Sequence, residues 1–179
     1  MILQTERLVL RGWNDADLAH FAELNADPLV MEFFPALLSR VESDAMAMRM
    51  QRHLDQYGWG LWAVEVRETG LFAGFIGLAE PKFQADFTPC VEIGWRLGTP
   101  FWRKGYATEG AAAVLAFGFG ELGLGEIVSF TTESNWRSRR VMERIGMTRD
   151  PTGDFDHPSL PGESHLRRHV LYRKAANRI

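Results

Sequence analysis

The stretch Val91–Phe119, VEIGWRLGTPFWRKGYATEGAAAVLAFGF, decides the fold. Up to Leu97 its residues alternate in polarity, which is typical of a strand with one buried face, and the other face carries Glu92 and Arg96. From Tyr106 onward the residues are small or apolar and predict a helix. The segment therefore predicts a strand, a short loop and a helix in direct succession.

The loop before this predicted helix has the features of a phosphate site. The N-terminus of a helix presents unpaired N–H groups and a partial positive charge. Gly105 and Ala107 remove side-chain bulk that would hold a diphosphate away from those amides, and Arg103 and Lys104 add positive charge. A tight strand-to-helix turn that binds nothing has the same composition, so both interpretations are open on these residues alone.

A second glycine-rich stretch, Gly118–Gly123, matches the G-x-G-x-x-G pattern of dinucleotide-binding proteins. It follows a predicted helix and precedes a predicted strand, whereas the dinucleotide pattern requires a strand, a turn and then a helix. We therefore interpret the stretch as the end of the helix, and we expect neither a nicotinamide nor a flavin site.

The rest of the chain alternates between strand and helix signals. Further strands are predicted at Thr5–Arg11, Leu61–Arg67, Leu71–Leu78, Glu126–Thr131 and His165–Tyr172. Further helices are predicted after the capping residues Asn14, Ser39 and Asn135. Asp150–Gly162 is rich in Pro, Gly and Asp and predicts a loop. This order predicts one α/β (α+β) domain over residues 1–179, with a mixed, mostly antiparallel sheet flanked by helices.

The composition is that of an ordinary globular protein, with 46% hydrophobic and 24% charged residues. A net charge of −3 gives no overall field that would attract nucleic acid or an anionic membrane. Cys90 is the only cysteine, which excludes an intrachain disulfide and favours a buried strand thiol in a reducing compartment. No stretch approaches the length of a membrane span, and Met1–Arg7 lacks an apolar signal region, so we expect a cytoplasmic protein without a membrane partner.

The C-terminal histidines could indicate a metal site, and a cluster of arginines could indicate a nucleic-acid site. His165 and His169 lie about 13 Å apart on a strand, which is too far to bind one ion. We therefore expect no metal. Four arginines crowd the helix predicted after Asn135, but only Trp136 supplies the aromatic surface that nucleic-acid binding requires, so we expect no nucleic-acid partner.

Several segments together resemble the GNAT superfamily of N-acetyltransferases, and within it the branch that contains the ribosomal-protein N-terminal acetyltransferases. Thr5–Arg11 resembles the opening strand of that branch. Glu92–Trp95 and Trp102–Glu109 resemble its acetyl-CoA strand and loop. Asn135–Ser138 with Glu143–Met147 resembles its second cofactor motif. The resemblance spans almost the whole chain, with the segments in the family's order.

The resemblance implies a GNAT fold in which the sheet splays beside the strand ending at Leu97 and leaves a cleft for acetyl-CoA as co-substrate. Backbone groups of Trp95 and Leu97 would pair with the pantetheine arm, and one backbone N–H would polarise the thioester carbonyl. Amides of the loop and the first helical turn would hold the pyrophosphate. The implied cofactor-binding residues are Trp95, Leu97, Arg103, Lys104, Gly105, Tyr106, Ala107, Thr108, Asn135 and Ser138.

Two positions depart from the superfamily's usual pattern. Trp102 stands where Gln or Arg is common, although an aromatic residue there is familiar in the ribosomal-protein branch. Met142 stands where many members have a Tyr that protonates the leaving thiolate, and Met cannot donate a proton. Ser138 is the substitute that the branch suggests, acting by hydrogen bonding to the thiolate at least as much as by protonating it. Asn135 is equally well explained as an ordinary helix N-cap.

Glu92 is the predicted general base, because a carboxylate on the cleft strand could take the ammonium proton directly or through water. Its alternative interpretation is a solvent-facing strand position. For the acceptor pocket we predict Trp13, Phe33 and His157. His157 is chosen because its segment resembles a tail found in a subgroup of the branch.

These residues predict an N-acetyltransferase that transfers acetyl from acetyl-CoA to a primary amine by direct attack in a ternary complex. The acceptor would be a protein or peptide N-terminus or a small molecule. A non-catalytic acyl-CoA-binding or regulatory module with the same fold is the alternative that Met142 keeps open. An RNA-associated protein is a third. Homodimers are common in families of this kind, so a homodimer is one expected assembly.

Overall fold

One mixed sheet runs through residues 2–176, the part of the chain that the computed structural model describes, in the order β1-β2-β3-β4-β5-β6-β8-β7. The strands are β1 (Leu3–Gln4), β2 (Leu8–Arg11), β3 (Leu61–Val66), β4 (Leu71–Ala79), β5 (Glu92–Leu97), β6 (Glu126–Thr132), β7 (Thr148–Asp156) and β8 (Arg168–Ala175). Neighbouring strands are antiparallel except β5 and β6, which are parallel. The predicted mixed, mostly antiparallel sheet is confirmed.

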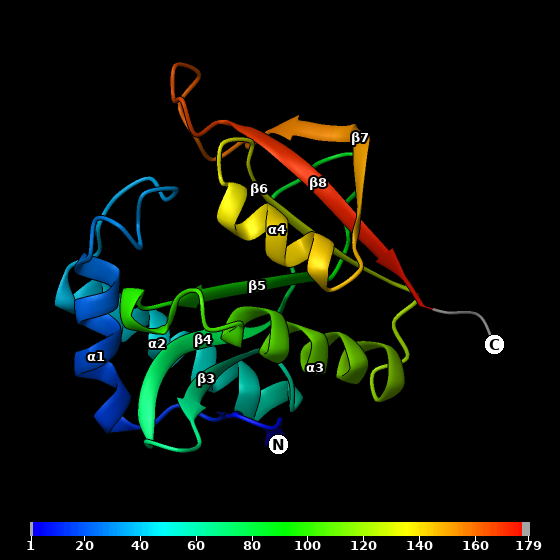
Figure 1. Cartoon of the computed structure of the whole chain (residues 1–179). Coiled ribbons are helices and arrows are strands. Elements are labelled where there is room, and N and C mark those ends of the chain that lie inside the picture. The colour runs from blue at the N-terminus through cyan, green and yellow to red at the C-terminus, as the bar shows by residue number, and fades with distance from the viewer. Residues whose placement is uncertain (1, 177–179) are drawn as a thin grey trace.

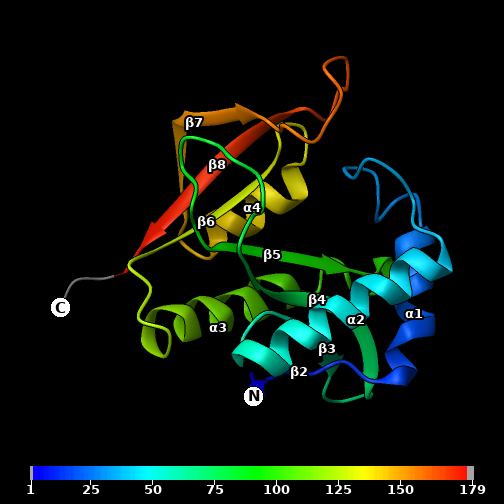
Figure 2. The same ribbon diagram turned by 180° about the vertical axis from the view of Figure 1, so that it is seen from behind.

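Helices cover both faces of this sheet. They are α1 (Asp15–Ala26), α2 (Arg40–Tyr57), α3 (Tyr106–Gly120) and α4 (Trp136–Arg144), with a short 3-10 helix η1 (Thr99–Phe101) before α3. α3 and α4 lie on one face and α1 and α2 on the other (Figures 1 and 2). No helix within residues 2–176 is long and apolar enough to cross a membrane.

The helix ends lie where the capping signals predict them. Asn14 and Ser39 each form a capping box with the acidic residue three positions later, so both predicted N-caps are confirmed. Asn135 caps α4 by accepting a hydrogen bond from the Ser138 N–H. α3 ends at Gly120, within the glycine-rich stretch that we interpreted as a helix end. The chain then turns through Gly123, whose φ is +63°.

The sheet opens between β5 and β6. These strands pair in register only at Glu92 and Val128, and beyond this pair they diverge. Figure 1 shows the result: β1 to β5 with α3 form one part of the protein, and β6, β8 and β7 with α4 form the other. The divergence confirms the splayed sheet that the family resemblance implies.

Two predicted element boundaries are wrong in the C-terminal region. Asp150–Gly162, expected to be a loop, contains most of β7, which pairs with β8 at the edge of the sheet. The pairing shifts register between Asp150 and Phe155, and this irregularity accommodates Pro151 and Gly153. The last strand begins at Arg168 rather than His165 and runs on to Ala175.

The loop between β4 and β5 crosses the face of β6, β8 and β7 that lies opposite α4 (Figure 2). It is fixed there by aromatic contacts, since Phe83 stacks on Phe155 at 5.7 Å and Phe87 lies 5.9 Å from Phe130, measured between ring centroids. Cys90, at the end of this loop, is half-buried and precedes β5 rather than lying in it, contrary to the predicted strand position.

Close approach of β3 and β4 at Gly77 yields a prediction about stability. A Cβ at this position would lie 2.0 Å from the Gly60 carbonyl oxygen and 2.7 Å from the Leu61 Cα, both backbone atoms that cannot move independently. We expect Gly77→Ala to lower the free energy of unfolding by about 2 kcal/mol or more, measured by urea denaturation. Gly125→Ala, where the added Cβ meets nothing within 4 Å, is the control and should change it by no more than about 0.5 kcal/mol. Equal effects of the two substitutions would contradict this account.

Candidate active site

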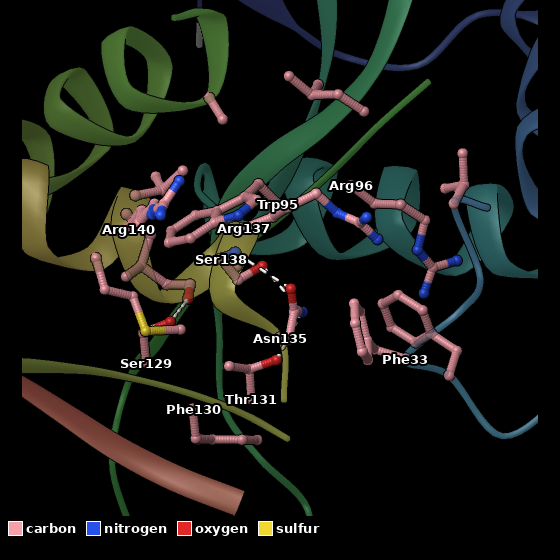
Figure 3. Close-up of a pocket in the computed structure, with 18 of the residues that line it drawn as sticks. Phe33, Trp95, Arg96, Ser129, Phe130, Thr131, Asn135, Arg137, Ser138 and Arg140 are labelled. Atoms are coloured by element: carbon pink, nitrogen blue, oxygen red, sulfur yellow. Dashed lines mark hydrogen bonds between the residues drawn. The ribbon is translucent and has the colours of Figure 1, made fainter. Parts of the chain in front are cut away.

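The divergence of β5 and β6 opens a cavity of about 1090 Å³. Its walls come from β5, the turn before α3, the first turn of α3, β6 and α4, and from two segments outside these elements, 30–35 and 157–160. Figure 3 shows side chains from several of these elements converging on the space. A cavity of this size, lined by apolar side chains together with charged and polar ones, is typical of a small-molecule site.

The first turn of α3 faces this cavity with unpaired amides. Gly105, at the N-cap, has a φ of +82° and no side chain makes a capping hydrogen bond. Arg103 also adopts a left-handed conformation, with a φ of +59°. Gly105, Tyr106, Ala107 and Thr108 all line the cavity. The turn therefore fits a diphosphate, because it combines free N–H groups with little side-chain bulk.

This turn is anchored to the start of the sheet by Glu109. The Glu109 carboxylate accepts hydrogen bonds from the Thr5 hydroxyl at 2.6 Å and from the Arg7 backbone N–H at 2.8 Å. Arg7 also donates to the Lys104 carbonyl at 2.9 Å. The start of the chain and the turn before α3, which are about a hundred residues apart in the sequence, are thus held together. The turn is therefore rigid before any ligand arrives.

Positive charge around the cavity comes from the turn itself and from the arginines of α4. Arg103 lines the cavity, but Lys104 does not, and its ammonium lies 5.9 Å from the centre of the Phe101 ring. Arg137, Arg140 and Arg144 of α4 line the opposite wall. The basic face of α4 therefore points at least in part into the cavity.

The free edge of β5 presents backbone groups to the cavity. The Gly98 N–H donates to the Ala73 carbonyl at 2.9 Å, and this bond fixes which residues of β5 pair with β4. Because hydrogen bonding alternates along a strand, the N–H and C=O of Trp95 then point away from β4, toward the gap. The Leu97 carbonyl has the same direction but already accepts a hydrogen bond from Trp102 Nε1 at 2.7 Å. Trp95 is thus the better placed of the two predicted backbone partners.

Asn135 and Ser138 enter the cavity from the start of α4 (Figure 3). The Asn135 side-chain amide donates to Ser138 Oγ at 3.2 Å and to Thr131 Oγ1 at 2.9 Å. Both interpretations of Asn135 therefore hold together, since it caps the helix and also lines the site. Ser138 keeps its hydroxyl proton available for a further acceptor. Met142, one turn later, lines the same wall and is buried.

Glu92 lies at the point where β5 and β6 part, and its side chain lines the cavity. Within residues 2–176 it makes no side-chain hydrogen bond and no ion pair. Burial raises its pKa from 4.5 to about 8, because a carboxylate withdrawn from water is favoured in its neutral form. An acid with this pKa can hold or release a proton near neutral pH, which is the property required of a general base.

The predicted acceptor residues divide into two groups. Phe33 and His157 line the cavity. Trp13 does not, which corrects its assignment to the acceptor pocket. It is buried, its Nε1 donates to the Leu61 carbonyl at 2.9 Å, and its ring packs on Phe21 at 4.8 Å. Trp13 therefore belongs to the core that holds α1 against the sheet.

Several cavity residues escaped prediction because they come from segments with no motif. Phe130 and His169 line the wall beside His157, and the two imidazole centroids are 5.1 Å apart. Burial lowers the pKa of both histidines, which favours neutral rings. Arg96 also lines the cavity. Its position on the same strand face as Glu92 is the one feature of the sequence from which this could have been predicted. No group of three or more His, Cys, Asp or Glu within residues 2–176 is arranged to hold a metal ion.

Comparisons with known proteins agree with this geometry. The family model described as "Acetyltransferase (GNAT) domain" matches residues 7–148. YkkB of Bacillus subtilis, an uncharacterised protein, is 35% identical over 146 residues, which is 81% of this chain and 84% of YkkB. The uncharacterised N-acetyltransferase YnaD of the same organism is 32% identical over 150 residues, which is 84% of each chain.

Solved structures share the fold. The GNAT-family acetyltransferase of Bacillus anthracis superposes with a TM-score of 0.81 at 26% identity, over 98% of both chains. RimL, a ribosomal L7/L12 alpha-N-protein acetyltransferase solved in complex with coenzyme A, gives a TM-score of 0.77 at 15% identity, also over 98% of both chains. The similarity to RimL is one of fold alone. RimL belongs to the ribosomal-protein branch that the sequence resembles.

The raised pKa of Glu92 predicts how stability depends on pH. The folded protein holds the Glu92 proton up to about pH 8, whereas the unfolded chain releases it near the ordinary value of 4.5. Stability from this group is therefore fully present below pH 4.5 and is lost as the pH rises toward about 8. Relative to Glu92→Gln, wild-type protein should lose unfolding free energy between about pH 5 and about pH 8.5, measured by urea denaturation. All other titrating groups are common to the two proteins, so parallel pH profiles would show that Glu92 is not buried as described.

Proposed function

Because the chain belongs to the GNAT acetyltransferase family, we propose that it transfers the acetyl group of acetyl-CoA to a primary amine by direct attack within a ternary complex. One observation carries the proposal: the unpaired amides of the first turn of α3 and the partnerless Glu92 carboxyl line the same cavity, beside the free edge of β5. The first can hold a phosphorylated donor and the second can accept a proton from an acceptor.

Acetyl-CoA supplies an acetyl group activated as a thioester. The amides of Gly105 to Thr108 would hold its pyrophosphate, with Arg103 and the arginines of α4 adding positive charge. The backbone of Trp95 would pair with the pantetheine arm as a neighbouring strand does. RimL, which has the same fold, was solved in complex with coenzyme A, and this supports a coenzyme A thioester as the donor.

Glu92 is the base in this proposal. An amine is protonated at neutral pH and must lose a proton before its nitrogen can attack a carbonyl carbon. The arrival of an ammonium group beside Glu92 favours the ionised carboxylate and lowers its pKa from about 8. The carboxylate can then take the proton, directly or through one water molecule.

Two further groups would stabilise the negative charge that develops on the carbonyl oxygen and on the leaving sulfur. A backbone N–H on the free edge of β5 is a fixed donor for the carbonyl oxygen, on which negative charge develops during attack. The Ser138 hydroxyl can donate a hydrogen bond to the sulfur that leaves, because its oxygen already accepts from Asn135 and its proton is directed elsewhere. Ser138 thus takes the place that Met142 cannot fill.

The diphosphate assignment predicts a selective loss of acetyl-CoA binding. Ala107→Glu places a carboxylate where the pyrophosphate would lie, and the like charges should weaken acetyl-CoA binding by at least about tenfold. Acidic residues are favourable in the first turn of a helix, so the fold should be retained. Ala112→Glu, an exposed position on the same helix, is the control and should leave the affinity unchanged. Calorimetric titration measures both affinities. Equal affinities for the two variants would place the phosphates elsewhere.

The base assignment predicts a loss of turnover together with a changed pH profile. Thiol release from acetyl-CoA, followed over a panel of amines, should show kcat lowered by about 100-fold or more in Glu92→Gln. In wild-type protein kcat/KM should rise with pH and level off above about 8, the pKa of Glu92 in the free enzyme. This step should be absent in the variant, whereas ionisation of the amine itself appears in both.

Two results would argue against these roles. If Glu92→Gln kept both the rate and the pH profile of the wild type, another group would be the base. If wild-type protein bound acetyl-CoA but released no thiol with any amine, the chain would be an acyl-CoA-binding module rather than an enzyme. Ser138→Ala should lower kcat less than Glu92→Gln does, because a hydrogen bond to sulfur contributes less than the proton acceptor.

A further inference from the structure

Arg96 is a buried cation on the wall of the cavity. It lies on β5, and its exposed fraction is 8%. Alternation along the strand places its side chain on the same face as Glu92 and on the opposite face from Trp95. That face is covered by α1 and α2, whereas α3, with its phosphate-binding turn, covers the other.

The guanidinium of Arg96 is held in place by neutral groups. Its Nη1 donates to Asn25 Oδ1 at 2.6 Å, and the Asn25 amide donates in turn to Ser43 Oγ at 2.9 Å, with both Asn25 and Ser43 fully buried. One face of the guanidinium lies 3.9 Å from the centre of the Phe34 ring, and the Phe75 ring lies 5.4 Å away. α1, α2 and the segment before α2 thus fix its orientation.

No carboxylate neutralises Arg96. None of the ion pairs within residues 2–176 includes it. Its Nε is buried and has no hydrogen-bond partner, and its Nη2 makes no hydrogen bond within those residues. Arg11 shows the usual arrangement for a partly buried arginine, since it binds the carboxylates of Asp17 and Glu65. A buried guanidinium with free donors and no counter-charge is costly, and a ligand anion would remove that cost.

The position of Arg96 identifies which substrate would supply the anion. The phosphates of the donor are assigned to the turn before α3, on the other face of β5. Glu92 lies on the same face as Arg96, four residues or about 13 Å along the strand, and both line one cavity. The acceptor amine is assigned to Glu92, so Arg96 faces the remainder of the acceptor.

We propose that Arg96 binds a carboxylate of the acceptor, so that the substrate is a small molecule bearing an amine at one end and a carboxylate at the other, as an ω-amino acid does. This inference rests on the proposed function. Arg96 Nη2 is the donor that neighbouring residues leave free, and a hydrogen bond from a guanidinium to a carboxylate is short and strong because both groups are charged. A single guanidinium against aromatic rings balances one negative charge, which favours a carboxylate over a phosphate dianion. The acceptor would then span the face of β5, with its amine at Glu92 and its carboxylate at Arg96.

An ion pair beside the site favours a small acceptor. Arg137 of α4 donates to Glu32 at 2.5 Å, and its guanidinium also lies over the rings of Phe33 and Trp102. This contact joins α4 to the segment that carries Phe34. A small molecule enters a cavity whose walls are joined in this way more readily than a folded protein surface does.

A purely structural role for Arg96 makes a different prediction. If the side chain only tied α1 to the sheet through Asn25, its replacement would affect all acceptors equally. A carboxylate site requires that the effect depend on whether the acceptor has a carboxylate. The ratio of kcat/KM between two acceptors that differ only in this group therefore separates the two roles.

The test uses matched acceptors with saturating acetyl-CoA and measures thiol release. The pairs are phenylalanine with phenethylamine and leucine with isoamylamine, in which the carboxylate lies beside the amine, and aminocaproate with pentylamine, in which five methylene groups separate the two. Aminocaproate is the acceptor that can reach from Glu92 toward Arg96. Wild-type protein should prefer the carboxylate member of its best pair by about tenfold or more in kcat/KM. Arg96→Met should reduce this preference to about twofold or less, and Arg96→Lys should keep part of it. Arg52→Met, which removes an exposed charge from α2 at a position that lines no cavity with Arg96, is the control and should keep the wild-type preference.

Two outcomes would overturn the proposal: wild-type protein that shows no preference for the carboxylate member in any pair, or Arg96→Met that slows both members of a pair equally. If no amine is acetylated at all, the proposed transferase function fails, and the carboxylate site is tested separately by binding. In the presence of coenzyme A, N-acetylaminocaproate should then raise the melting temperature of wild-type protein more than N-acetylpentylamine does. That difference should vanish in Arg96→Met, and equal shifts in the wild type would reject the site.

Discussion

The loss of pairing between β5 and β6 beyond Glu92 and Val128 is the constraint on which the rest of the structure depends. A strand in the interior of a sheet normally bonds on both sides, because unpaired backbone groups away from water are costly. Here β5 bonds fully only to β4. The edge it leaves open is the reason that a cavity exists inside a continuous sheet, and it supplies backbone donors and acceptors that only a ligand or water can satisfy.

The edge and the two faces of β5 point in different directions, and each presents different groups. The edge of β5 presents the backbone of Trp95 to the cleft, one face packs beneath α3, and the other face carries Glu92 and Arg96. These directions are at right angles or opposite to one another, so in the proposed function donor and acceptor meet at the strand without competing for the same surface. Placement of this kind supplies a large part of the rate in a reaction between two bound substrates.

The charged side chains withdrawn from water differ in whether a carboxylate neutralises them. Arg11 is neutralised by Asp17 and Glu65, and it joins β2 to α1 and β3. Arg96 is buried and Glu92 is half-buried, and neither has such a partner within residues 2–176. Folding alone gives no reason to keep two unpaired ionisable groups in a cavity, and departures from the usual pairing tend to mark sites where a ligand completes the interaction.

Local signals in the sequence were enough to predict most of the elements and the turn proposed to bind the donor. Polarity alternation fixed β5, capping residues fixed the helices, and the small residues around Gly105 fixed the turn before α3. The same signals misplaced β7, where Pro151 and Gly153 imitate a loop, because edge pairing with β8 is a long-range interaction. The residues proposed for the acceptor side could be identified only from the tertiary structure. Trp13 proved to be core and Arg96 proved to be unpaired, since burial and the absence of a counter-charge are set by segments distant in the chain.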